Sequence, residues 1–311
     1  MLIFTLRRLL QFVPTILVIS LIMFLLLNVL PGNAALMAAG SQEQGIDSKF
    51  IEQMKKQWDL DKPLHIRYLI YLKNLARGDL GLSFLRRESV TALILARFWP
   101  TLKLAMAAML IAVALGIPLG FLSALRQGSW LDVCSMLGAV SGVSMPQFWL
   151  GLLLMFFLSV KVRLFPTSGY GDGGLAHLIL PAITLGLGYM ALLARTTRAA
   201  VLEILNADYV RTAQAKGLPQ LMIHRKHVLR NALILVLTTA GLQFGSLIGQ
   251  TVIVEKLFSW PGIGSLLVDT IFQRDIPVVQ GCVLLIILVF LLVNLAVDLL
   301  YAVIDPRIEY R

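Results

Sequence analysis

The chain has 311 residues, of which 58% are hydrophobic and 14% are charged, and its net charge at pH 7 is +10. Soluble domains have roughly a quarter of their residues charged, so this composition excludes an ordinary soluble domain and predicts a membrane protein. In so apolar a chain a basic excess indicates membrane topology rather than nucleic-acid binding, and the two cysteines, both in apolar runs, exclude a disulfide framework.

Six apolar runs are long enough for α-helices that cross a bilayer, which takes about 20 residues. In chain order they cover residues 9–30, 104–125, 133–160, 178–194, 231–254 and 276–297. The third run has Pro146 near its middle, which predicts a helix that tilts or bends. Arg7 and Arg8 precede the first run, as in a signal peptide, but the run lacks an Ala-x-Ala-like cleavage site, so we expect a retained helix.

The distribution of basic residues predicts which loops face the cytoplasm. With six spans both termini share one side, whose segments hold twelve Lys and Arg residues, against four in the short loops of the other side. Because positively charged loops stay in the cytoplasm, we expect both termini there. The twelve are Arg7, Arg8, Arg126, Arg195, Arg198, Arg211, Lys216, Arg225, Lys226, Arg230, Arg307 and Arg311; the four are Lys161, Arg163, Lys256 and Arg274.

A long polar segment, residues 31–100, follows the first run and is expected outside the cytoplasm. It divides the chain into an N-terminal helix (1–30), this extracytoplasmic segment (31–100) and a five-helix core (101–311). Apolar spacing predicts helices over 48–58 and 64–76 within it, followed by a turn at Gly78 and Gly81. Two interpretations stay open, a cap on the helix ends or a contact surface for an extracytoplasmic partner.

The loop between the fourth and fifth runs, residues 195–230, is called the inner loop below. It carries seven basic and two acidic residues and is expected to be helical. Within it, DYVRTAQAKGL (208–218) places Ala213 and Ala215 before Gly217, a helix stop, with Pro219 just beyond. Small side chains let a helix approach another surface closely, which predicts a docking helix. From composition alone, a solvated basic connector is the alternative.

This loop resembles a part of the permease subunits of bacterial ABC importers, in the branch for dipeptides, oligopeptides, nickel and glutathione. DYVRTAQAKGL followed by HVLRNALI is similar to their cytoplasmic Glu-Ala-Ala loop, with Arg211, Thr212 and Ala213 at the Glu-Ala-Ala positions. Segments 7–33, 78–84, 142–160, 254–281 and 297–308 also resemble this branch, in the same order along the chain. Leu235 stands where many relatives have Pro, which affects only a local bend.

The resemblance implies an all-α membrane protein with six transmembrane helices and the type I importer permease fold. Two such permeases pair, each laying its loop helix into a groove of one of two cytoplasmic ATPases, while a substrate-binding protein delivers cargo from outside. The residues that it implies for ATPase coupling are Tyr209, Arg211, Ala213, Ala215 and Gly217. The chain has no GxxxxGK[ST] phosphate loop, so we expect no enzyme and no cofactor here, with ATP and Mg²⁺ bound by the partner ATPases.

Two further places carry predictions. Trp260, Pro261, Gly262 and Gly264, called the outer turn below, interrupt the helical pattern and indicate a re-entrant loop or a loop over the outer mouth. An ordinary turn is the alternative, and the resemblance favours a gate. Asp298 ends the last apolar run, and we expect it to pair with a basic residue rather than to contact cargo.

A charged cargo requires a hydrated path between two permeases. Polar residues within the spans are expected to line it: Gln243, Ser246, Gln250 and Asn294. The preferred cargo is a di- or oligopeptide, with glutathione or nickel as the alternatives in the same machinery. A secondary transporter would show an inverted repeat and midplane charges, and an assembly protein would need no docking helix, so both are less favoured. His224 and His227 lie among basic side chains, so no metal site is predicted.

Overall fold

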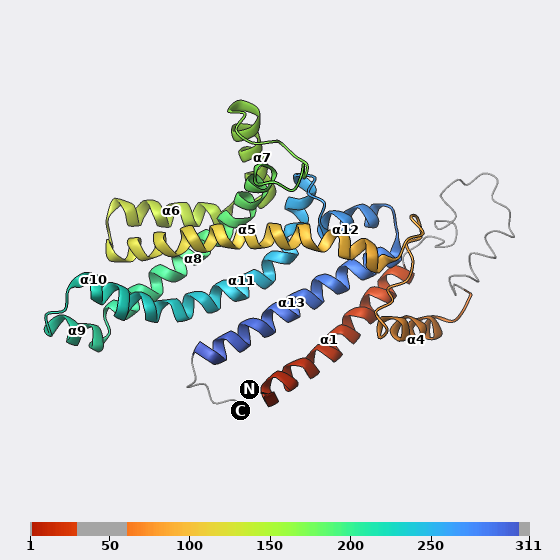
Figure 1. The fold of residues 1–311 in the computed structure, drawn as a ribbon, viewed down its shortest axis with the longest axis horizontal. Coiled ribbons are helices and arrows are strands. Elements are labelled where there is room, and N and C mark those ends of the chain that lie inside the picture. The colour runs from red at the N-terminus through yellow and green to blue at the C-terminus, as the bar shows by residue number, and fades with distance from the viewer. Residues whose placement is uncertain (1, 30–60, 305–311) are drawn as a thin grey trace.

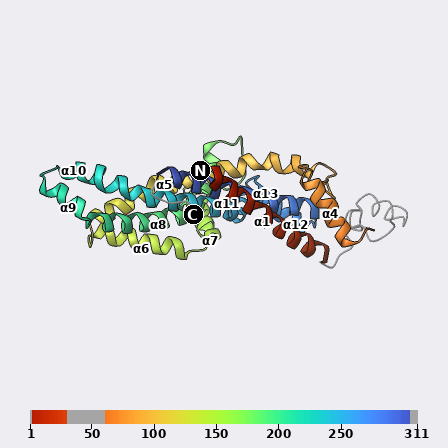
Figure 2. The same ribbon diagram turned by 90° about the horizontal axis from the view of Figure 1, so that it is seen from below.

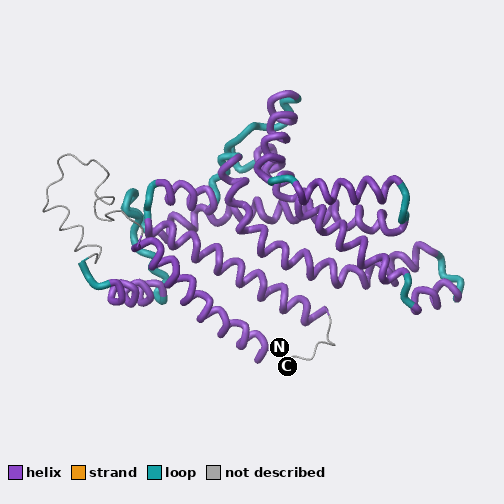
Figure 3. Tube along the Cα trace, turned by 180° about the vertical axis from the view of Figure 1, so that it is seen from behind, coloured by secondary structure: helices purple, strands orange, loops and turns teal. Residues whose placement is uncertain are grey.

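The computed structural model describes residues 2–29 and 61–304, and within these ranges the regular elements are all helices, joined by turns and loops, with one isolated bridge between Leu82 and Ser89 (Figures 1 and 3). The elements are α1 (Leu2–Val29), α4 (Leu64–Leu75), α5 (Val90–Leu125), α6 (Trp130–Ser144), α7 (Gln147–Leu154), the π-helix η1 (Met155–Lys161), α8 (Leu175–Leu205), α9 (Asp208–Ala215), α10 (Gln220–Met222), the π-helix η2 (Ile223–Leu229), α11 (Arg230–Leu257), α12 (Ile263–Phe272) and α13 (Ile276–Ile304).

Five of the described helices are long and apolar enough to span a membrane, or six if α6 and the α7–η1 segment form one bent span. These two segments meet at an angle of 109°, so the third predicted run, 133–160, is not a straight span. The break lies at Met145, whose backbone is extended, and Pro146, which has no N–H to donate and disfavours a helical conformation in the residue before it. The α7–η1 segment therefore leaves the bundle (Figure 1).

Small residues hold α5 and α8 close together. Ala112, Gly116, Gly120 and Ala124 recur every four residues on the buried face of α5. A Cβ added at Gly116 would lie 2.8 Å from the Met190 carbonyl oxygen of α8. Such small-xxx-small spacing lets helix backbones touch, which is how helices associate where lipid removes the hydrophobic driving force.

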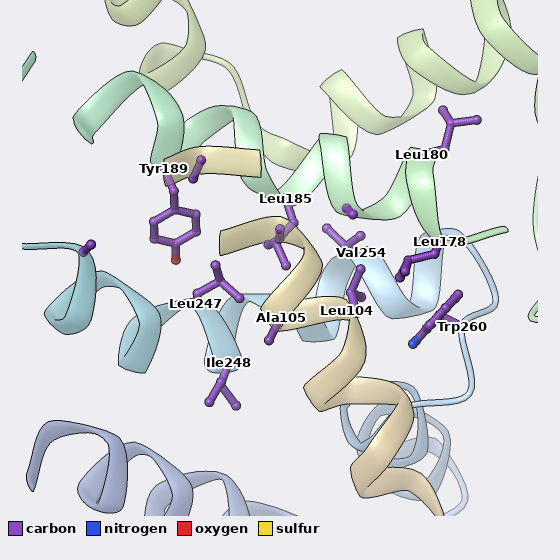
Figure 4. Packing of buried hydrophobic residues seen from close by; sticks show 14 of the residues in the cluster. Leu104, Ala105, Leu178, Leu180, Leu185, Tyr189, Leu247, Ile248, Val254 and Trp260 are labelled. Atoms are coloured by element: carbon purple, nitrogen blue, oxygen red, sulfur yellow. The ribbon is translucent and has the colours of Figure 1, made fainter. Parts of the chain in front are cut away.

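The largest apolar cluster lies where α5, α8 and α11 meet. Leu104 of α5, Leu185 of α8 and Val254 of α11 are buried and point toward one another (Figure 4). Trp260, just after α11, closes the cluster. These three helices therefore form the central core of the described chain.

The elongated bundle has two distinct ends (Figures 1 and 2). One end carries α9 and α10, and the other carries α4 and α12; we call them the α9 end and the α12 end. The starting half of α1 lies beside the closing half of α13, where an Arg8 guanidinium nitrogen is 3.1 Å from Asp298 Oδ2. The prediction that Asp298 pairs with a basic residue is thus confirmed.

Helices α5 and α8 extend furthest beyond their predicted apolar runs. α5 begins at Val90, so the boundary predicted at Pro100 falls inside this helix and eleven residues of the 31–100 segment belong to it. The helix continues through Pro100, whose own carbonyl oxygen accepts a hydrogen bond from Trp260 Nε1 at 2.9 Å. α8 continues to Leu205, which confirms that the inner loop starts as a helix.

The rest of the 31–100 segment that the structure describes packs on the helix ends. The predicted helix 64–76 is confirmed as α4, and Tyr68 contacts α1, with its hydroxyl 3.0 Å from Ser20 Oγ and its ring 5.3 Å from that of Phe24. Further on, buried Asp275 accepts hydrogen bonds from Ser83 Oγ and the Phe84 backbone N–H, which ties this segment to the α12–α13 junction. The predicted helix over 48–58 lies outside the described residues.

Candidate functional site

The inner loop is built around the short helix α9. It ends in two reverse hydrogen bonds, from Gly217 N–H to Gln214 O at 2.9 Å and from Leu218 N–H to Ala213 O at 3.3 Å. Gly217 has φ +74°, the left-handed conformation that such a helix end requires and that glycine adopts without strain. The sequence thus folds into a compact helix whose end is sharply defined.

One face of α9 is buried in its own chain. Val210 and Ala213 pack with Val201 of α8, Ile223 of η2 and Ala124 of α5; we call this set the loop cluster. Ala213 therefore lies on the buried face of α9 and contacts this cluster within its own chain. The opposite face is exposed, with Arg211 and Ala215 one turn apart.

Tyr209 is half-exposed, and its hydroxyl is anchored. Asn231 Nδ2 donates to Tyr209 Oη at 3.1 Å and to the His227 carbonyl oxygen at 2.7 Å. Tyr209 thus ties α9 to the start of α11. Together with the loop cluster, this anchor fixes α9 to the ends of three long helices.

The exposed surface of the inner loop is basic. Its exposed cations are Arg195, Arg211, Lys216, Arg225, Lys226 and Arg230, against the exposed carboxylates Glu203 and Asp208. Such a surface suits a partner with an acidic groove. His224 and His227 lie on η2, and in the described ranges no group of three or more His, Cys, Asp or Glu side chains is placed to hold a metal ion.

The outer turn is packed into the α12 end. Trp260 is fully buried, and its ring lies 4.7 Å from that of Tyr170. The chain then enters α12, whose ten residues are too few to cross a bilayer. The turn is therefore closely packed and leads into a short helix, while the re-entrant loop and the loop over the outer mouth stay predictions.

A buried carboxylate that the sequence reasoning missed organises this turn. Glu255 of α11 is fully buried and accepts hydrogen bonds from Thr101 Oγ1 at 2.7 Å and from the Ser265 backbone N–H at 3.0 Å. Thr101 Oγ1 also accepts from the Ile263 N–H at 2.8 Å. A Cβ at Gly262 would collide with the Glu255 carboxylate, so this position needs glycine. The network joins α5, α11 and the start of α12.

Three of the predicted path residues form a stripe along α11. Gln243, Ser246 and Gln250 follow one another at intervals of three and four residues, and we call them the polar stripe. Gln250 Oε1 accepts from Gln147 Nε2 of α7 at 2.9 Å, and Ser246 Oγ lies 3.4 Å from the Tyr189 hydroxyl of α8. The Gln243 amide is buried with neither polar atom hydrogen-bonded within the described chain.

Asn294 lies apart from the polar stripe. On α13 it faces Gly245, where an added Cβ would be 3.2 Å from Asn294 Oδ1. Gly245 points to a different side of α11 from the stripe, because it is offset by about 100° from Ser246. Two residues outside the prediction, Gln147 and Tyr189, join the stripe instead. Gln147 directly follows Pro146, so the sequence feature that could have identified it is a polar side chain next to a helix break.

Comparison with known proteins adds to this geometry. A family model described as the binding-protein-dependent transport system inner membrane component matches residues 116–310, and the model for the N-terminal part of such membrane components matches residues 1–105. The chain belongs to this family. It is thus a permease subunit of a bacterial ABC importer, a multi-pass protein of the inner membrane.

Full-length relatives support the assignment to these permeases. The chain is 44% identical over 311 residues to the glutathione transport system permease protein GsiC of Escherichia coli K12, and 46% identical to that of Pectobacterium atrosepticum, with 100% of each chain covered. An inward-facing structure of the MetNI methionine ABC transporter aligns with TM-score 0.57 and 21% identity over 68% of this chain and 96% of that one. An amino acid ABC transporter aligns with TM-score 0.53 and 17% identity, covering 70% and 95%. The permease therefore has the type I importer fold.

Proposed function

We propose that this permease forms half of a glutathione path and is driven by separate ATPases through α9. The observation that carries this proposal is the exposed basic face of α9, which sits on a helix fixed by its buried side to α5, α8 and η2. A force applied to this face is transmitted to the bundle because α9 is packed directly against it. With α9 in the cytoplasm, both termini lie there too, in agreement with the basic residue count.

The relatives' names favour glutathione as cargo over the dipeptides preferred from sequence. GsiC proteins are glutathione transport permeases, and they match this chain from end to end. Glutathione was the alternative among the sequence predictions. Its peptide-like backbone offers amide groups that side-chain amides and hydroxyls can hydrogen-bond.

The partners follow from the same assignment. We place a second permease across the path, two ATPases that bind ATP and Mg²⁺ under the α9 end, and a substrate-binding protein over the α12 end. The outer turn would then lie below the binding protein and form an immobile part of the gate, since Trp260 is buried and hydrogen-bonded to α5.

The polar stripe supports the location of the path. Ser246 and Gln250 are exposed in the single chain, halfway along an apolar helix. Each has a partner within the chain, but hydrocarbon would leave the remaining donor and acceptor positions of the Gln250 amide unpaired, which is costly. Water, cargo or a second permease must therefore cover this side of α11.

Replacing Ala215 by Asp tests the coupling role. The new carboxylate would stand on the exposed face of α9, adding bulk and charge where an ATPase docks. We expect glutathione uptake in proteoliposomes to fall at least tenfold and ATPase co-purification to weaken, while the permease still inserts into the membrane.

Thr167→Asp is the matched control, since Thr167 is equally exposed but belongs to the loop before α8, far along the chain from α9. It should transport normally. Normal uptake and ATP turnover in Ala215→Asp would remove α9 as the docking element. Ala213→Asp is unsuitable here, because its carboxylate would enter the loop cluster and unfold the loop itself.

Gln250→Met tests the path. Losing the amide removes the hydrogen bond with Gln147 and a contact for cargo, and because the cargo contact is worth about 1 kcal/mol, uptake should fall roughly fivefold with basal ATP turnover unchanged. Gln273→Met, at an exposed position after α12, is the control with the same chemical change. Asn294→Leu measures whether α13 also lines the path. Undiminished uptake in Gln250→Met would place the path elsewhere.

A further inference from the structure

A buried ion pair joins α6 to α8 near the α9 end. Asp132, in the first turn of α6, accepts two hydrogen bonds from Arg198 of α8, from Nε to Oδ1 at 2.6 Å and from Nη2 to Oδ2 at 2.8 Å. It also accepts from Ser123 Oγ of α5 at 2.5 Å and from the Gly128 N–H at 2.9 Å. The Asp132 side chain is 6% exposed and that of Arg198 25%. We call this network the clamp.

The clamp is specific in its geometry. A two-pronged guanidinium–carboxylate contact fixes both distance and orientation, which a lysine cannot do. Buried ion pairs add little net stability compared with apolar packing, so stability alone is a weak reason for this one. What it does supply is a directional connection between three helices at one point.

One side of the clamp borders the docking helix. Arg198 stands just before Ala200 and Val201 on α8, and Ser123 stands beside Ala124 on α5. Ala200, Val201 and Ala124 all belong to the loop cluster that holds α9. A displacement of α9 therefore acts on the same turns of α5 and α8 that carry the clamp.

The other side of the clamp leads to the polar stripe. α6 runs from Asp132 to Ser144, and after the break at Met145 and Pro146 the chain continues with Gln147. Gln147 donates to Gln250 on the stripe. α8 contributes residues to the loop cluster, but in the described chain α6 contributes none. The clamp therefore provides the polar contact between α6 and the turns of α5 and α8 that hold α9.

We propose that Asp132 and Arg198 are positioning residues that make α6 move together with the α9 end of α8, and so carry the ATPase stroke to the bend before Gln147. This inference rests on the proposed function for the source of the stroke. Without the clamp, α9 would still dock and ATP would still be hydrolysed, but α6 would follow the movement loosely.

The test uses the full assembly in proteoliposomes with its ATPases, second permease and binding protein, and labelled glutathione as the probe. We expect Arg198→Lys and Asp132→Asn to lower the glutathione transported per ATP hydrolysed by about fivefold or more, with assembly and ATP turnover retained. Arg126→Lys is the control with the same type of change, since Arg126 is an exposed arginine just after α5 that belongs neither to the clamp nor to the inner loop. The double variant Asp132→Arg, Arg198→Asp should recover part of the ratio.

A wild-type ratio in both single variants overturns the proposal, and so does a loss of assembly in every variant, which would give the clamp a merely structural role. A second measurement needs no cargo: spin labels at exposed Cys134 on α6 and at Glu203→Cys on α8, in a Cys282→Ala background, report the distance between the helices. Arg198→Gln should broaden this distance distribution at least twofold, and an unchanged width overturns the clamp. If the wild-type assembly transports no glutathione, the proposal of glutathione as cargo is wrong. The distances between the spin labels then still test the proposed role of the clamp.

Discussion

Gly120→Ala is expected to separate α5 from α8 and to destabilise the permease by about 3 kcal/mol or more. An added Cβ would lie 2.7 Å from Thr197 Cβ and even closer to the Ala194 carbonyl oxygen. A backbone oxygen cannot rotate away as a flexible side chain can, so the two helices must move apart. The measurement is the apparent melting temperature of the purified permease in detergent, together with its yield from membranes.

Gly138→Ala provides the comparison for this substitution. Gly138 lies on α6, and an added Cβ there would meet nothing within 4 Å. Because alanine favours a helix more than glycine does, by about 1 kcal/mol, this variant should melt at the same temperature or higher. Equal melting temperatures for Gly120→Ala and wild type would show that α5 and α8 are not packed backbone to backbone.

Thr101→Val should have the second large effect, through the network under the outer turn. The substitution keeps the shape but removes the donor to Glu255 Oε1 and the acceptor for the Ile263 N–H. Each buried group left without a partner costs about 1–3 kcal/mol, and more when it is charged, so the loss should reach about 3–5 kcal/mol. We expect a lower melting temperature and faster proteolysis in the segment around α12.

Thr184→Val isolates the network from the general effect of losing a hydroxyl. Thr184 is fully buried on α8, and its hydroxyl donates only to the Leu180 oxygen of its own helix. That oxygen keeps its place in the helix, so the cost should stay below about 1 kcal/mol. If both valine variants behaved alike, the Thr101 network would not be what holds the turn.

The spans and the inner loop could be predicted because they depend on local patterns. Apolar run length sets where a helix crosses, and the small residues before Gly217 and Pro219 indicate where α9 ends. The burial of Ala213 was also within reach of the sequence. Val210 and Ala213 are three residues apart, with Leu218 just past the helix end, which is the spacing of one apolar face.

The remaining features depend on contacts between distant segments. Pro100 indicated a helix boundary in the sequence, whereas α5 runs through it and Trp260, 160 residues away, donates to its carbonyl oxygen. Pro146 signalled a break, but its 109° angle depends on packing against other helices. The Glu255 network and the Asp132 clamp likewise need pairs that no local spacing reveals.

The contact between the α5 and α8 backbones limits how this permease can change shape. Two helices that touch through glycine and alanine have no long side chains between them to slide or tilt on, so they form a single rigid unit. α11 is joined to this unit at the α12 end through Glu255 and Thr101. The loop cluster joins the same three helices at the α9 end, so we expect the freedom to bend to concentrate at the Pro146 break, where the α7–η1 segment leaves the bundle.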